Sequence, residues 1–72
     1  MDPTEFQLRG EHIALDALLK ATGLASSGGH AKVVVASAAV QVNGLSETRR
    51  GRKLRAGDEV ALDGKLIRVM AA

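Results

Sequence analysis

The sequence predicts an α+β domain in which two helices, arranged like a helix-turn-helix, pack on a small, mainly antiparallel sheet of four to five short strands. A chain of 72 residues has room for a single hydrophobic core. Apolar residues follow helical spacing in the first half of the chain and alternate with polar residues in the second half. We therefore expect one domain over residues 5–70, with flexible tails at residues 1–4 and 71–72.

A short strand followed by a helix opens the predicted domain. Residues 5–9 alternate between polar and apolar, which is typical of a strand, and Gly10 ends the alternation. The pattern over residues 13–21 is helical, and Gly23 is suited to a left-handed cap at its end. Asp16 in the first turn and Lys20 in the last turn complement the helix dipole. The core face of this helix would consist of Leu15, Leu18, Leu19 and Thr22, with Ile13 and Ala17 beside it.

A second helix is predicted over residues 31–39, although its β-branched run Val33-Val34-Val35 would by propensity alone favour a strand. Ser26 and Ser27 are candidate N-caps, and several alanines follow them. The residues expected to face the core are Ala31, Val34, Val35 and Ala38. Exposed N–H groups at a glycine-flanked helix start can bind an anion, and Lys32 one turn further adds a full charge. The alternative, that Gly28-Gly29 only forms a tight turn between helices, stays open.

Strands and turns fill the second half. A strand over residues 40–43 enters the turn Asn43-Gly44, a strong hairpin signal. A turn over residues 56–58 then leads to a hairpin over residues 59–69, closed by Asp63-Gly64. The predicted pairs are Glu59 with Arg68, Val60 with Ile67, and Leu62 with Lys65, and the predicted buried face consists of Val60, Leu62, Ile67 and Val69.

Residues 49–55, with the sequence RRGRKLR, form a basic segment that we expect to hang off one edge of the sheet. This segment holds five of the ten Lys and Arg residues and no acid. The charge is asymmetric, since residues 1–31 carry two basic and four acidic side chains, net −2, and residues 32–72 carry eight and four, net +4. Such a cluster attracts polyanions, most often a phosphate backbone.

Other function classes find little support. There is no Cys, and His12 and His30 lack the further ligands of a zinc site, so no metal or cofactor is expected. We expect His12 at the surface near the start of the first helix and His30 as a polar residue near the start of the second. No motif places His12 or His30 against Ser26, Ser27 or Ser37, and the glycines match no nucleotide-binding loop, so we predict neither catalysis nor a small-molecule substrate. No signal peptide or membrane span is visible, which favours a cytoplasmic protein, and we expect a monomer.

The segments LDALLKATGLASSGGHAK, VQVNG, RRGRKL and AGDEV, in this order, resemble the alpha-L RNA-binding motif of ribosomal protein S-four, and in particular the short stand-alone bacterial proteins of the YbcJ-like group. The resemblance implies that the helix pair and the basic loop dock on structured RNA, ribosomal or transfer RNA, and possible association with the ribosome. It assigns a role in fixing the turn to Asn43 and Gly44. With Arg55 from the basic segment, the RNA-binding candidates are Ser27, Gly28, Gly29, Lys32, Asn43, Arg49, Arg50, Arg52, Lys53 and Arg55.

The sequence departs from the family pattern at three positions. Gly28 stands where Arg is frequent, His30 where an acid is frequent, and Ala38 where Gly is common before the VxVNG strand. The second helix therefore brings less charge than usual, and a protonated His30 would add to the positive face. The substitution at Ala38 bears on the local backbone geometry and not on the function.

The mode of binding follows from the lack of aromatic residues. Phe6 is the single aromatic side chain and is expected in a core strand, so recognition should rest on phosphates and RNA shape, not on base stacking. We expect Lys32 and the basic segment to form one continuous patch. Three alternatives stay open: a DNA-binding module, whose second helix is poor in base-reading residues; a module that binds an acidic protein; and a basic loop that only guards a sheet edge.

Overall fold

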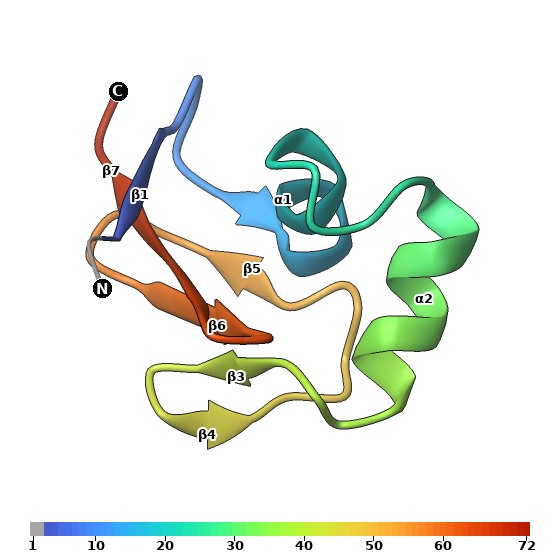
Figure 1. Cartoon of the computed structure of the whole chain (residues 1–72). Helices are drawn as coiled ribbons and strands as arrows, with labels where there is room; N and C mark the ends of the chain where they lie inside the picture. Colours follow the sequence, from blue (N-terminus) through green and yellow to red (C-terminus); the bar gives the residue numbers. More distant parts are fainter. Residues whose placement is uncertain (1–2) are drawn as a thin grey trace.

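The computed structural model describes residues 3–72, and Met1 and Asp2 of the predicted tail lie outside the described residues. It has the predicted α+β architecture, with two helices packed on one side of a small sheet (Figure 1). The elements in chain order are β1 (Thr4–Gln7), β2 (Ile13–Ala14), α1 (Leu15–Ala21), α2 (Gly28–Ala36), β3 (Gln41–Val42), β4 (Leu45–Ser46), β5 (Lys53–Leu54), β6 (Glu59–Leu62) and β7 (Lys65–Met70).

The main sheet has the strand order β1-β7-β6-β3-β4 and is antiparallel except for the parallel pair β1 and β7. The β6–β7 hairpin has the predicted register, with Glu59 opposite Arg68 and Leu62 opposite Lys65. Its predicted inner face, Val60, Leu62, Ile67 and Val69, is buried. β1 begins at Thr4, which belongs to the predicted tail, and the β3–β4 hairpin adds a strand that was not predicted.

The first helix begins at Leu15, two residues later than predicted, because Ile13 and Ala14 pair with β5 in a separate two-stranded sheet. Leu15, Leu18 and Leu19 are fully buried, as predicted. Ala17 is exposed, so it does not flank the core face. Gly23 has a φ of +78°, which confirms the left-handed end of α1.

The second helix spans Gly28–Ala36 and so lies about three residues earlier than predicted, although its valine run is helical as expected. The Oγ of Ser27 accepts a hydrogen bond from the His30 N–H at 3.1 Å and caps the helix. Ala31 and Val35 are buried and Val34 is half-buried, but the assignment of Ala38 to the core face is wrong. Ala38 is exposed with a φ of +64°, since the chain leaves the helix there through a left-handed residue.

The hydrophobic core lies between the two helices and the inner face of the sheet. Phe6 is half-buried and packs against it from β1. Among the described residues, no helix is long and apolar enough to cross a membrane. The residues with the largest fully buried side chains are Leu15, Leu18, Leu19, Leu54, Ile67, Val35, Val40, Val42, Val60 and Val69.

Candidate nucleic-acid interface

The backbone of the basic segment is fastened to the start of α1. The carbonyl oxygen of Arg52 accepts the N–H of Leu15 at 2.8 Å, and that of Arg50 accepts the N–H of Asp16 at 3.0 Å. The N-cap residue of α1, Ala14, makes no side-chain cap, so the segment supplies acceptors that the first turn of the helix would otherwise lack. Lys53 also pairs with Ala14 through β5 and β2. The prediction that the segment hangs off the sheet edge is therefore wrong, because the segment is held to α1 through Arg50 and Arg52 and to β2 through Lys53.

A buried carboxylate holds two side chains of the segment. Glu47 is 7% exposed and is the one buried charged side chain within residues 3–72. Its carboxylate accepts the Nε–H and Nη2–H of Arg49 at 3.0 and 3.1 Å, and an Nη1–H of Arg52 at 2.9 Å. The backbone N–H of Arg49 donates to the same group at 3.0 Å. These hydrogen bonds, led by the one from the Arg49 side chain, lower the pKa of Glu47 to about 2, so the group is ionised at neutral pH.

The other cations of the segment have no such partner. No carboxylate within residues 3–72 forms an ion pair with Arg50, Lys53 or Arg55, and all three are exposed. Their charges are therefore available to an external anion, while Arg49 and Arg52 share one negative charge. The segment divides into a clamped pair of arginines and three unpaired cations.

Asn43 lies at a junction that supports the end of the basic segment. Its Oδ1 accepts the Glu59 N–H at 2.9 Å, and its Nδ2 donates to Asp58 Oδ1 at 3.1 Å. The other oxygen of Asp58 accepts the Arg55 N–H at 2.8 Å. Partial burial raises the pKa of Asp58, but the hydrogen bonds from Arg55 and Asn43 outweigh it and lower the pKa below its usual value. Both polar groups of the Asn43 side chain are thus used inside the protein, in keeping with a structural role in the turn.

The start of α2 lies across the first turns of α1 from the basic segment. Gly28 shares a shallow hollow with Asp16, Ala17 and Lys20 of α1. Because the Asp16 N–H also binds the carbonyl of Arg50, the first turn of α1 contacts both the basic segment and the start of α2. Ser27, Gly28, Gly29 and Lys32 are all exposed, and Lys32 lies one turn after Gly28 on the same side of α2.

His30 lies against Ser26 at the start of α2. Its Nδ1 lies 3.0 Å from the backbone nitrogen of Ser26 and 3.3 Å from the Oγ of the same residue, so the structure places a histidine ring beside a serine where the sequence offers no motif for it. His30 is exposed and lies near the start of α2, as predicted, and its backbone N–H binds the Oγ of Ser27 in the first turn. His12 is likewise exposed, beside the connection from β1 to β2.

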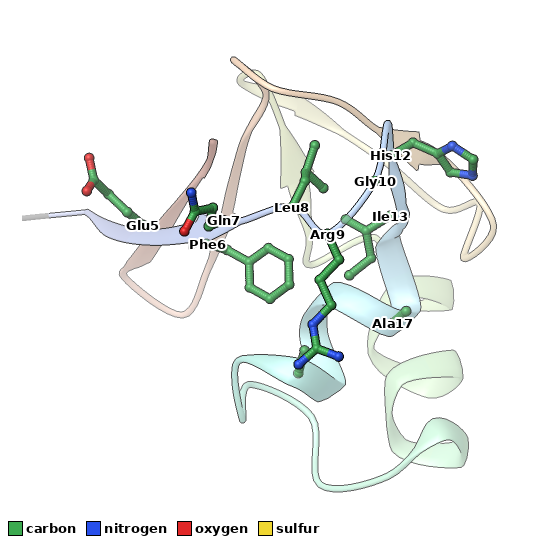
Figure 2. Close-up of a pocket in the computed structure, with 10 residues that line it drawn as sticks. Glu5, Phe6, Gln7, Leu8, Arg9, Gly10, His12, Ile13 and Ala17 are labelled. Carbon is green, nitrogen blue, oxygen red and sulfur yellow. The ribbon is translucent and has the colours of Figure 1, made fainter. Parts of the chain in front are cut away.

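A separate hollow lies between β1 and α1 (Figure 2). The Phe6 ring and the Arg9 side chain both border this space, with Ile13 and Ala17 from the β2–α1 segment. His12 lies at one end, and Glu5 and Gln7 lie along β1. Within the part of the chain that the structure describes, no cluster of three or more His, Asp or Glu side chains could hold a metal ion.

Comparison with known proteins places the fold in a family. The S4 domain family matches residues 6–70, nearly the whole chain. This chain is a member of the S4 domain family. It is 40% identical over 60 residues to the putative RNA-binding protein YbcJ of Escherichia coli, covering 83% of this chain and 86% of the relative. It is also 43% identical over 54 residues to the probable ribosome maturation protein RlbA of Bacillus subtilis, covering 75% of this chain and 76% of the relative.

A solved structure supports the same assignment. The solution structure of Escherichia coli YbcJ, described as revealing an alpha-L motif involved in RNA-binding, superposes on this S4 domain with a TM-score of 0.74. The sequences are 36% identical, and the match covers 99% of this chain and 91% of the neighbour. The predicted family and fold are confirmed.

The structure of this S4 domain fixes the basic segment to α1 and β2 and places Gly28, at the start of α2, beside the first turns of α1. Sequence reasoning missed Glu47, although a single acid two residues before an arginine-rich run was visible as a signal. Its burial and its two arginine partners depend on how the β4–β5 connection folds back toward the core, which no local pattern shows.

Proposed function

We propose that this S4 domain is a non-catalytic RNA-binding protein that places the basic segment and the start of α2 against the phosphate backbone of structured RNA, ribosomal or transfer RNA. The observation that carries the proposal is the set of unpaired, exposed cations Arg50, Lys53 and Arg55 on a backbone fixed to α1. Exposed cations without acidic partners repel one another and are stabilised when phosphates neutralise them.

The fixed backbone favours structured RNA as the ligand. Because α1 and β2 hold the segment, its cations keep their spacing before an RNA arrives, and less conformational entropy is lost on binding. Lys32 and the exposed N–H groups at the start of α2 add a second anion-binding point. Ser27, Gly28 and Gly29 contribute through this helix start, whereas Asn43 contributes by holding the turn.

The surface offers little for other modes of nucleic-acid recognition. Phe6 packs against the core, so its ring is no platform for unpaired bases. The exposed side of α2 carries Gly29, Lys32, Val33 and Ala36, which lack the paired donors and acceptors that read bases in a DNA major groove. Recognition through phosphate positions and RNA shape is the mode that remains.

The names of the relatives support this proposal and direct the search for the RNA. One relative is called a putative RNA-binding protein and another a probable ribosome maturation protein. We therefore propose ribosomal RNA, in the cytoplasm and in the context of the ribosome, as the first target to test, with transfer RNA as the second. Binding by a single domain as a monomer is part of the same proposal.

The test is crosslinking of the protein to RNA in cells, followed by sequencing of the bound fragments. The wild type should enrich defined sites, and the double variant Arg50→Ala/Lys53→Ala should lose them, since it removes two unpaired charges. Lys65→Ala is the matched control, because Lys65 is an exposed lysine beside the other end of α1, near Thr22 and Gly23. Equal recovery from the wild type and the double variant would refute the proposal. Capture of a protein that survives ribonuclease treatment would point to an acidic protein partner instead.

A further inference from the structure

We propose that Glu47 is a positioning residue of the RNA-binding surface, which holds the Arg49 and Arg52 guanidinium groups as a pre-oriented pair of phosphate donors. This inference deepens the proposed function and rests on it. It assigns a role in binding a polyanion to a negatively charged residue, which charge alone would not suggest.

The hydrogen bonds of Glu47 hold the guanidinium groups of Arg49 and Arg52 in a defined geometry, which we call the clamp. The carboxylate binds Arg49 in a parallel fork, with Nε on Oε2 and Nη2 on Oε1, and Arg52 Nη1 also binds Oε1. The backbone N–H of Glu47 donates to the carbonyl of Val40, a fully buried residue, at 2.9 Å. Both ends of Glu47 are therefore held, one by the edge of the core and one by the two arginines.

The clamped arginines remain able to bind an external anion. The Arg49 side chain is 75% exposed and the Arg52 side chain 33% exposed, in contrast to the 8% exposed side chain of Glu47. A guanidinium has five N–H donors. Arg49 uses the Nε–H and one Nη2–H to bind Glu47, and Arg52 uses one Nη1–H. Each arginine therefore keeps further N–H donors for a phosphate. The carboxylate is therefore on the buried side of the arginines, which face the solvent on their other side.

The charge of Glu47 and its effect on the orientation of the two arginines act in opposite directions on RNA binding. The Glu47 carboxylate reduces the net charge of the surface and so weakens attraction to any polyanion. In return it fixes two long side chains that would otherwise lose rotamer freedom on binding, a cost that grows with each side chain immobilised. Fixed guanidinium groups favour an RNA whose phosphates already have a matching spacing. A flexible polyanion adapts to mobile cations equally well and gains less from the clamp.

The test separates these two effects with Glu47→Gln, which keeps the side-chain size and removes the charge. Fluorescence anisotropy would measure binding to two labelled structured RNAs, a transfer RNA and a helical-junction fragment of ribosomal RNA, and to poly(U), beside elution from heparin. We expect binding to the structured RNA preferred by the wild type to weaken roughly fivefold or more, the cost of ordering two released side chains. Binding to poly(U) and heparin should be unchanged or tighter.

Glu59→Gln is the matched control, because Glu59 also pairs with an arginine, Arg68 on β7, at 3.0 Å and lies outside the segment. It changes the net charge equally and should leave the preference for structured RNA over poly(U) intact. Tighter binding of Glu47→Gln to all the polyanions would show that Glu47 only offsets charge. Weaker binding to all of them would show that it only maintains the fold. Either result overturns the inference.

A second variant keeps the inference testable if Glu47→Gln does not fold. Arg49→Lys preserves the segment charge and leaves Arg52 on Glu47, but it breaks the parallel fork. Its affinity for structured RNA should fall about fivefold with unchanged elution from heparin, and wild-type affinity would overturn the inference. A wild-type protein that binds neither structured RNA would refute the proposed function itself, together with this inference. If the wild type binds structured RNA, and both variants bind it with the affinity and preference of the wild type, this inference is refuted while the proposed function stands.

Discussion

Replacing Lys53 with alanine is expected to reduce the salt dependence of RNA binding by about one phosphate contact. The proposed surface contains six basic side chains, Lys32 and the five of the basic segment, and the Glu47 carboxylate offsets one of them. About five effective contacts give a slope of log K against log salt of roughly −3.5 to −4.5, at ~0.7 to 0.9 for each phosphate. The Lys53→Ala variant should therefore have a slope smaller in magnitude by ~0.7 to 0.9.

The assay is fluorescence anisotropy with one structured RNA at several salt concentrations, from roughly 50 to 300 mM, in parallel for the wild type, Lys53→Ala and Lys65→Ala. Both lysines are exposed and both lie on strands, so the two substitutions are closely matched. Lys53 lies beside the start of α1 through its pairing with Ala14, and Lys65 lies near the residues that end α1. The slope of Lys65→Ala should equal that of the wild type. Thermal denaturation should show stabilities within about 0.5 kcal/mol of each other, as for other surface substitutions.

An unchanged slope in Lys53→Ala would remove Lys53 from the interface and contradict the count of contacts. An equal reduction in both variants would mean that overall net charge, and not a localised surface, governs binding. Either result would refute the reasoning that unpaired cations on a fixed backbone form the RNA-binding site.

The remaining predictions concern stability, the α2 cap and acid. Ala38→Gly should raise the free energy of unfolding by about 0.5–1 kcal/mol, because it relieves a left-handed alanine at φ +64°. The control Ala36→Gly, within α2, should lower the free energy of unfolding by up to about 1 kcal/mol. A thermal melt in which Ala38→Gly is also destabilised would contradict this account. Ser27→Ala should cost about 1 kcal/mol of stability through loss of the helix cap. Ser27→Asp should keep the cap but weaken RNA binding through its negative charge. Wild-type RNA affinity of Ser27→Asp would remove the start of α2 from the interface. The pKa of Glu47 is lowered from 4.5 to about 2, so its contribution to stability is present above pH 4.5 and is lost as the pH falls through 2. Acid titration of Glu47→Gln should therefore lack this part of the stability loss, and identical curves for variant and wild type would contradict it.

Several elements were predictable because short-range chemistry determines them. The register of the β6–β7 hairpin follows from the Asp63-Gly64 turn and the alternation of apolar residues on both sides. The helical state of the valine run follows from the Ser27 cap and the surrounding alanines, which outweigh β-branched propensity. The boundaries were less accurate, as in α2, since the sequence does not show that a helix continues into Gly28-Gly29.

The residues of the candidate site could be read from the sequence, but the contacts among them could not. The basic segment and the start of α2 were visible as residues, and the family resemblance connected them. The pairing of Arg49 and Arg52 with one Glu47 carboxylate was not visible, because it depends on the burial of Glu47 in the folded chain. The use of both Asn43 polar groups inside the protein was equally hidden, since their partners are Asp58 and the backbone of Glu59.

The sequence by itself thus determined the fold class, the β6–β7 hairpin, the family and the location of the positive charge, since each depends on neighbouring residues or on a recognisable pattern. The tertiary structure alone decided how that charge is presented. Its contacts join positions far apart in the chain, such as the carbonyl of Arg52 with the N–H of Leu15, and the parallel pairing of β1 with β7. Such contacts form only when the core closes and brings unsatisfied backbone groups together, so the sorting of the basic segment into clamped and unpaired cations is a property of the folded domain.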